Sequence, residues 1–103
     1  MPVTLEQDGA LSLIRLQGAI DIFCAQELRE LLVQGLKTAS EVRVLLAGAT
    51  DMDVTAVQLL WAARREAKAS SVKFAFEGAA PEPVSAALAE AGLEMFTATG
   101  ETN

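Results

Sequence analysis

A short apolar run that leads through a turn into an amphipathic helix constrains this chain more than any other stretch. Residues 41–46 read EVRVLL and are followed by a cluster of small residues. Such a run is typical of a buried strand that is covered on both faces. Small and apolar residues then recur over residues 54–69 at the spacing of one helical stripe. The sequence therefore predicts a strand, a turn and a helix over residues 41–69.

Asp53 stands directly before this helix and is predicted to be its N-cap. Its carboxylate can accept a hydrogen bond from an otherwise unpaired amide of the first turn, and its charge suits the positive end of the helix. Thr55 then lies in that first turn, at an exposed junction of strand and helix. A phosphate added to Thr55 would meet free backbone N–H groups, while Asp51 and Asp53 would repel it.

The N-terminal part of the chain predicts a hairpin. Apolar segments near residues 3–6 and 11–16 flank an Asp-Gly turn. The alternation of apolar and polar residues slips at Leu13 and Ile14, which indicates either a bulge or a strand covered on both faces. Residues 18–21 are expected to end this second strand.

Three helices are expected, near residues 23–37, 54–69 and 82–91, because apolar side chains recur there at helical spacing. Asp21 is expected to cap the first helix. Pro81 suits the first position of the third, where a missing N–H costs nothing.

A further strand is predicted at residues 72–77, with Phe74 and Phe76 facing the core. Strands that alternate with helices indicate an α/β domain in which helices pack on one mixed sheet of four or five strands. The N-terminal hairpin is antiparallel and the remaining strands are mostly parallel. We expect one domain over residues 1–103, with a flexible tail at 97–103.

Composition excludes several classes of function. Cys24 is the only cysteine and there is no histidine, so a disulfide within the chain, a Cys/His metal cluster and a histidine base are ruled out. No apolar run approaches the roughly 20 residues that span a bilayer, and no signal peptide is evident, so we expect a soluble, cytoplasmic protein without membrane insertion. The net charge of −6 disfavours nucleic acid and favours a protein partner with a basic surface.

Four other side chains have simpler interpretations. Asp51 and Asp53 resemble a metal-binding pair, but two carboxylates in a turn are more often caps, and we expect no metal and no cofactor. Cys24, near a helix start, is expected to be a packing residue rather than a reactive thiol. Trp61 lies beside the core stripe and is expected to pack at its edge.

These segments resemble the STAS domain, as in the bacterial anti-sigma-factor antagonists. The resemblance rests on residues 16–21, on the strand at 42–46 and on residues 53–60, and it covers nearly the whole chain. The family's motif places a phosphoacceptor hydroxyl two residues after an aspartate, which is Thr55 in this sequence. Val54 and Ala56 depart from the serine and glycine of that motif. Residues 58–65 are also similar to small STAS proteins of chemotaxis-type signalling.

The resemblance implies a non-enzymatic, protein-binding regulatory module of bacterial signalling, controlled by phosphorylation of Thr55. Its partner would be an anti-sigma factor, a related serine/threonine kinase or another signalling protein. An alternative is a constitutive STAS subunit of a lipid-transport complex, with Thr55 as an interface contact. Nucleotide binding has been linked to the family, but the chain has no glycine-rich phosphate loop. The residues expected to bind the partner are Asp21, Asp53, Val54, Thr55, Ala56 and Gln58.

Overall fold

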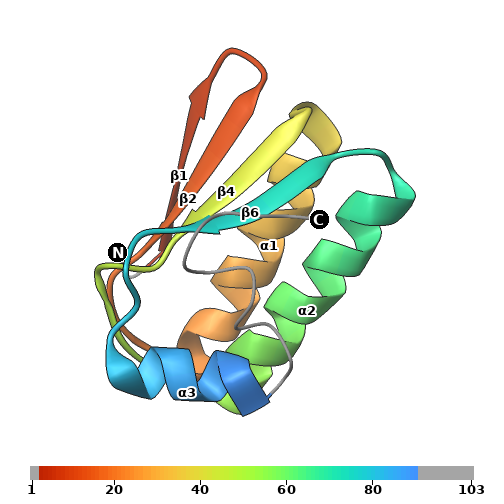
Figure 1. Cartoon of the computed structure of the whole chain (residues 1–103). Helices are drawn as coiled ribbons and strands as arrows, with labels where there is room; N and C mark the ends of the chain where they lie inside the picture. Colours follow the sequence, from red (N-terminus) through yellow and green to blue (C-terminus); the bar gives the residue numbers. More distant parts are fainter. Residues whose placement is uncertain (1–2, 91–103) are drawn as a thin grey trace.

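The computed structural model describes residues 3–90, in which strands alternate with helices after an N-terminal hairpin (Figure 1). Six strands and three helices occur in this part of the chain. In chain order they are β1 (Val3–Asp8), β2 (Leu11–Leu16), β3 (Gly18–Ile20), α1 (Ile22–Thr38), β4 (Glu41–Leu45), β5 (Ala49–Met52), α2 (Val54–Ala69), β6 (Lys73–Glu77) and α3 (Glu82–Glu90).

The main sheet has four strands in the order β1-β2-β4-β6. β1 pairs with β2 in antiparallel register, and β2–β4 and β4–β6 are parallel pairs. Helices α1 and α2 lie beside each other on one face of this sheet, and α3 lies across one end of the molecule (Figure 1). The predicted α/β class, the antiparallel hairpin and the parallel remainder are confirmed.

The core lies between the sheet and the helices α1 and α2. Val42 and Val44 of β4 and Phe76 of β6 are buried there, and Phe74 packs edge-on against Phe76 with ring centroids 5.5 Å apart. Burying one such side chain contributes about 1.5–3 kcal/mol. The predicted inward orientation of both phenylalanines is confirmed.

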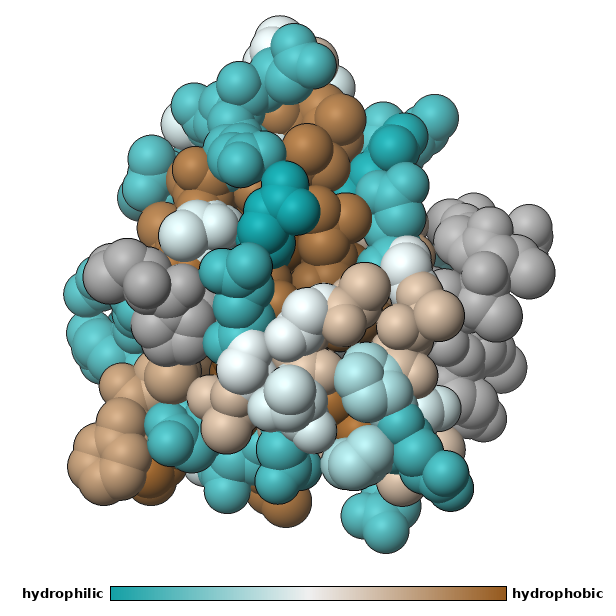
Figure 2. All heavy atoms as spheres, turned by 90° about the vertical axis from the view of Figure 1, so that its left-hand side faces the viewer, coloured by the Kyte–Doolittle hydropathy of each residue, from teal (hydrophilic) through white to brown (hydrophobic). Residues whose placement is uncertain are grey.

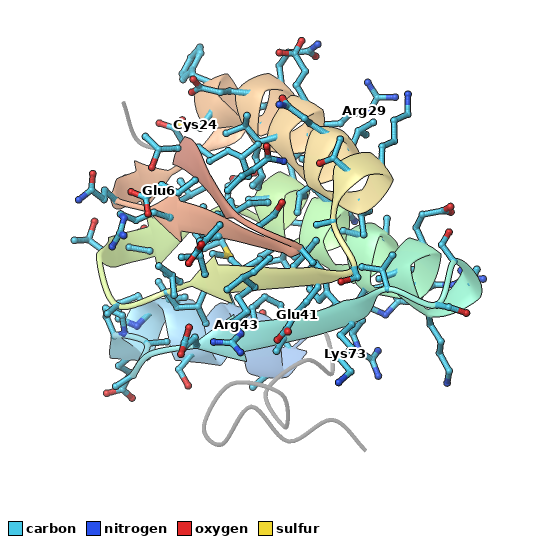
Figure 3. The ribbon with its side chains drawn as sticks, turned by 90° about the horizontal axis from the view of Figure 1, so that it is seen from above. Glu6, Cys24, Arg29, Glu41, Arg43 and Lys73 are labelled. Carbon is cyan, nitrogen blue, oxygen red and sulfur yellow. The ribbon has the colours of Figure 1, made fainter. Side chains whose placement is uncertain are left out.

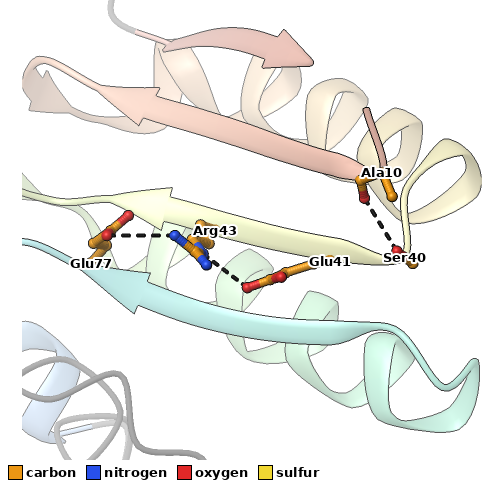
Figure 4. A network of polar contacts seen from close by, with 5 residues as sticks. All are labelled: Ala10, Ser40, Glu41, Arg43 and Glu77. Atoms are coloured by element: carbon orange, nitrogen blue, oxygen red, sulfur yellow. Dashed lines mark hydrogen bonds and ion pairs between the residues drawn. The ribbon is translucent and has the colours of Figure 1, made fainter. Parts of the chain in front are cut away.

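The other face of the main sheet carries no helix among the described residues, which corrects the expectation that β4 is covered on both faces. Glu41 and Arg43 point to this face, where the guanidinium Nε of Arg43 donates to a carboxylate oxygen of Glu41 at 2.8 Å (Figures 3 and 4). Glu77 of β6 lies 3.7 Å from the same guanidinium. Apolar side chains also gather on this face between polar ones (Figure 2). They are tolerated because the long charged side chains cover part of them.

The slip in alternation along β2 has a different cause from either predicted one. The register of β2 with both neighbours is regular, and its burial alternates without interruption. Ser12 is fully buried on the helix side, whereas Leu11 and Leu13 point to the uncovered face and are half-buried. Within residues 3–90, β2 therefore has neither a bulge nor a helix on its second face: a small polar residue stands at an inward position and leucines stand at outward ones.

The prediction of a single sheet is incomplete, because β3 and β5 form a second, two-stranded parallel sheet. These segments were expected to be a strand end and a turn. They are three and four residues long and contain mostly small or polar side chains, so they lack the apolar pattern that identifies a strand.

The predicted helix bounds agree closely with the structure. The helix expected at 54–69 is α2, the helix expected at 23–37 is one residue longer at each end, and the third begins at Glu82, directly after Pro81. Its predicted last residue, 91, and the tail at 97–103 lie outside the described residues.

Gly48 lies where the backbone passes close to that of Leu16, and this position has no room for a side chain. A Cβ at this position would lie 2.8 Å from the carbonyl oxygen of Leu16, whereas a Cβ at Gly35 in α1 would meet its nearest atom at an ordinary 3.5 Å. Gly48→Ala should therefore lower the free energy of unfolding by about 1–3 kcal/mol through overpacking. Gly35→Ala, the control, should raise it by up to about 1 kcal/mol through helix propensity. Urea denaturation followed by circular dichroism measures both, and equal effects of the two changes would contradict this account.

Candidate functional site

The two sheet-to-helix junctions of the small sheet lie side by side. β3 leads through Asp21 into α1, and β5 leads through Asp53 into α2. The parallel register sets Ile20 opposite Met52, and the backbone N–H of Asp53 donates to the carbonyl oxygen of Ile20 at 2.8 Å. This pairing brings the N-termini of both helices to the same end of the molecule.

Both helices have an aspartate N-cap, as predicted. The Asp21 carboxylate accepts a hydrogen bond from the Phe23 N–H at 3.0 Å, and the Asp53 carboxylate accepts one from the Thr55 N–H at 2.9 Å. Both caps have extended backbone angles. Each carboxylate therefore satisfies an N–H group that the helix itself leaves unpaired.

A hollow of about 280 Å³ separates the two junctions. Asp51 lies in β5 rather than at a helix cap, and its carboxylate accepts a hydrogen bond from the Met52 N–H at 2.8 Å. Within residues 3–90, no group of three histidine, cysteine or acidic side chains is placed to hold a metal ion. The hollow is lined by Ala19, Ile20, Asp21, Asp51, Met52, Asp53 and Val54.

Thr55 is the second residue of α2 and is half-buried beside the hollow. Of its predicted neighbours, Val54 is 66% exposed and Gln58 is exposed. Ala56 is fully buried in the core. We therefore leave Ala56 out of the surface that a partner can touch.

Two residues that the sequence interpretation missed, Ile22 and Phe23, follow the Asp21 cap. Ile22 is 61% and Phe23 is 90% exposed. Together with Val54 they are large apolar side chains at the starts of both helices, and exposed apolar groups of this kind often mark protein interaction sites. A signal was present in the sequence, because two bulky apolar residues follow the cap without belonging to the helix's buried stripe. We call Ile22, Phe23 and Val54, with Asp21, Asp51, Asp53 and Thr55, the junction surface.

Cys24, in the first turn of α1 (Figure 3), has the character of a packing residue. Its Sγ lies 3.8 Å from the carbonyl oxygen of Ala19, and it packs against the core. Desolvation raises the pKa of the thiol, and the negative charges of Asp21 and Glu27 act in the same direction. The thiolate, which is the reactive form, is therefore disfavoured.

The fold and this site define a small α/β domain that offers a mixed acidic and apolar surface at two helix N-termini. The chain belongs to the STAS family, because the family model described as "Mlab, STAS domain" matches residues 3–98.

Solved structures with the same fold include several anti-sigma-factor antagonists. The antagonist SpoIIAA in its unphosphorylated form has a TM-score of 0.81 and 19% identity, with 93% of this chain and 85% of that chain covered. The phosphorylated form of SpoIIAA, described as a Bacillus cell fate determinant, has a TM-score of 0.76 and 18% identity, covering 93% and 88%. An antagonist from Mycobacterium paratuberculosis has a TM-score of 0.78 and 14% identity, covering 92% and 80%.

The structural similarities establish the fold, and the family model establishes the family. A comparison with curated proteins gave no match. The similarity to chemotaxis-associated STAS proteins, which was inferred from residues 58–65, receives no support from the structural matches or the family model. Among the described helices, none is long and apolar enough to cross a membrane.

The Asp53 cap can be tested by substitution. Asp53→Ala removes the acceptor for the Thr55 N–H and should lower the free energy of unfolding by about 0.5–2 kcal/mol. Asp53→Asn keeps an acceptor oxygen and should lie within a few tenths of a kcal/mol of the parent chain. Urea titrations measure both, and a loss of equal size in the two variants would show that the side chain does not act as a cap.

The raised pKa of Cys24 predicts slow alkylation at neutral pH. Iodoacetamide should react more slowly with the native chain than with the same chain unfolded in urea, because less thiolate is present in the native state. The native rate should still increase at a pH above the ordinary thiol pKa of about 8.5, where the unfolded rate begins to level off. Mass spectrometry of timed samples measures both rates. A native rate that exceeds the unfolded rate at pH 7 would contradict the assignment.

Proposed function

We propose that this chain is a non-enzymatic regulatory module that binds a signalling protein through its junction surface and is switched by phosphorylation of Thr55. In this proposal the partner is an anti-sigma factor or a related serine/threonine kinase of bacterial signalling. The observation that carries the proposal is the position of Thr55, in the first turn of α2, next to the Asp53 cap and to exposed Val54.

The junction surface is suited to a partner protein that has a basic surface with an apolar pocket in it. Phe23, Ile22 and Val54 provide exposed apolar groups, and an aromatic anchor of this kind is typical of the residues that dominate binding energy. The carboxylates of Asp21 and Asp53 lie beside them. Opposite charge on the partner would steer association and set the orientation of the complex.

Phosphorylation would change this surface electrostatically. A phosphate adds about −1.5 to −2 charges at pH 7, close to Asp53 on a chain that already carries a net charge of −6. A partner fitted to a neutral hydroxyl would then have to desolvate a cluster of like charges. The N–H groups of the first turn of α2 would hold the phosphate within the domain, so the fold survives while the interface is lost.

The similarity to SpoIIAA supports this proposal. SpoIIAA has the same fold, and its structure is known in an unphosphorylated and a phosphorylated form. The absence of histidine from the chain supports a non-enzymatic role, because the commonest general base of hydrolases is missing.

A second candidate is a constitutive STAS subunit of a lipid-transport complex. The matching family model is described as "Mlab, STAS domain" and does not name an anti-sigma-factor antagonist, so it does not single out the antagonist role. Val54 and Ala56 also depart from the serine and glycine of the phosphoacceptor motif. In this candidate the junction surface is the same, but Thr55 is a permanent contact.

Three forms of the chain distinguish the two candidates. Thr55→Glu should weaken binding to the partner recovered from cell extract by about tenfold or more, which corresponds to 1.4 kcal/mol, because a charge replaces a neutral contact. Thr55→Ala should bind and resist phosphorylation. Both variants should unfold within about 1 kcal/mol of the parent chain, and mass spectrometry of Thr55 reports its modification.

The control is Gln34→Glu, which adds the same charge at an exposed position of α1. Its binding should stay within about twofold of the parent chain, because residue 34 lies roughly 18 Å along the helix from Ile22. If Thr55 carries no phosphate in the chain recovered from cells, the switch is wrong and the constitutive subunit replaces it; if all forms also bind alike, Thr55 is not a contact in either candidate.

A further inference from the structure

Charge is segregated along this chain, and the second half of α2 is its basic part. Residues 54–73 contain four of the eight basic residues and one of the fourteen acidic ones. This segment therefore carries a net charge of +3, and the rest of the chain carries −9. The net charges of the two parts therefore attract an anion to this segment and repel it from the rest of the chain.

Three of these cations share one shallow hollow. Arg64, Arg65 and Lys68, with Ala69, line a depression of about 360 Å³ on α2. Arg65 and Lys68 are exposed. Lys73 follows at the start of β6 (Figure 3). We call Trp61, Arg64, Arg65 and Lys68 the basic surface.

Trp61 does not line this hollow itself, but it contacts Arg65, which does, and so places an apolar group next to the hollow. The tryptophan is 41% exposed, and the guanidinium carbon of Arg65 lies 4.9 Å from the centre of its ring. Trp61 was expected to pack at the edge of the core, and its intermediate exposure leaves part of the residue accessible beside Arg65. A stacked arginine keeps most of its N–H donors free for a carboxylate, because the stacking uses only the face of the guanidinium.

Ordinary helix stabilisation accounts for only part of this arrangement. A cation in the last turn of a helix interacts favourably with the C-terminal carbonyl groups, which explains Lys68. It does not explain Arg65 or the exposed ring of Trp61. Glu66 does not line this hollow: it lines a separate groove between α1 and α2, and its carboxylate accepts a hydrogen bond from Ser70.

We propose that the basic surface docks a short acidic segment of a partner protein. Carboxylates of that segment bind Arg65 and Lys68, and one apolar side chain of the segment packs against Trp61. The charge pattern favours a short segment over an extended polyanion. A membrane surface or a nucleic acid would cover a larger area and meet the acidic remainder of the chain, whereas a short peptide needs only this hollow.

This surface is separate from the junction surface but lies on the same helix. Thr55 and Arg65 are ten positions apart, which is about 15 Å along the axis of α2. One partner can therefore contact both surfaces. Docking at the basic surface does not depend on Thr55 being modified.

Trp61 is a built-in reporter for this docking, because the chain has one tryptophan and no tyrosine. The probe is a 12-residue peptide of glutamates with leucines at helical spacing, and its counterpart replaces every glutamate by glutamine. The acidic peptide should change the emission of Trp61 in a saturable way, and the glutamine peptide should not. The affinity should fall with added salt, because the Debye length shrinks from about 10 Å at 0.1 M to 3 Å at 1 M.

A matched pair of variants tests the location. Lys68 and Lys37 stand in the last turns of α2 and α1 respectively, so Lys68→Glu and Lys37→Glu alter the net charge and the helix end alike. Lys68→Glu should weaken binding of the acidic peptide by about fivefold or more, and Lys37→Glu should leave it within about twofold. Circular dichroism establishes that both variants fold, and Lys68→Gln replaces Lys68→Glu if the latter does not.

Other outcomes overturn the proposal. It fails if the acidic peptide gives no saturable change, or if Lys68→Glu and Lys37→Glu weaken binding equally. If duplex DNA or vesicles containing phosphatidylserine bind more tightly than the acidic peptide, the surface belongs to a different class of partner and the proposal is wrong. Thr55→Glu should leave peptide binding within about twofold, because the added charge lies more than one Debye length away at physiological salt. A loss of partner binding in that variant therefore reports on the junction surface alone.

Discussion

The parallel pairing of β3 with β5 is the interaction on which the rest of the site depends. This small sheet consists of seven residues. It is extended to the start of α2 by a hydrogen bond from the N–H of Asp53 to the carbonyl oxygen of Ile20. Without that pairing, two aspartate caps that are 32 positions apart in the chain would have no reason to meet. With it, the positive ends of two helices and the exposed apolar side chains that follow their caps share one surface.

The two proposed surfaces follow from how charge is placed on this scaffold. Aspartates stand at the helix starts because unpaired N–H groups stabilise them there. Cations stand in the second half of α2, next to an exposed aromatic ring. A single helix therefore presents an acidic, apolar end and a basic, aromatic flank, which are suited to different parts of one partner or to two partners.

Long elements could be predicted from the sequence because their periodicity is strong. The helix at 54–69 and the inward phenylalanines of β6 follow directly from apolar spacing. β3 and β5 could not be found in this way, because pairing between strands of three and four residues is decided by tertiary context rather than by their own side chains. The sheet face that no described helix covers was missed because Leu11 and Leu13 occupy outward positions on it.

The sequence predicted the caps and the hydroxyl of the candidate site better than it predicted which residues make up its surface. Both caps and the position of Thr55 follow from local sequence rules. Ile22 and Phe23 were missed because the prediction used helical periodicity only to find buried residues, although both are apolar residues that lie off the buried stripe. Ala56 was assigned to the surface by its proximity in sequence to Thr55, and the helix instead turns it into the core.

The parallel topology also decides when the junction surface comes into existence. Apart from the β1–β2 hairpin, the strand pairs of the described chain join segments separated by a helix, and such non-local contacts form late because loop closure must precede them. A nascent or unfolded chain thus contains Thr55 but not the surface around it. A kinase that reads this surface would recognise a three-dimensional epitope rather than a linear motif, and its action would be confined to molecules that have completed folding.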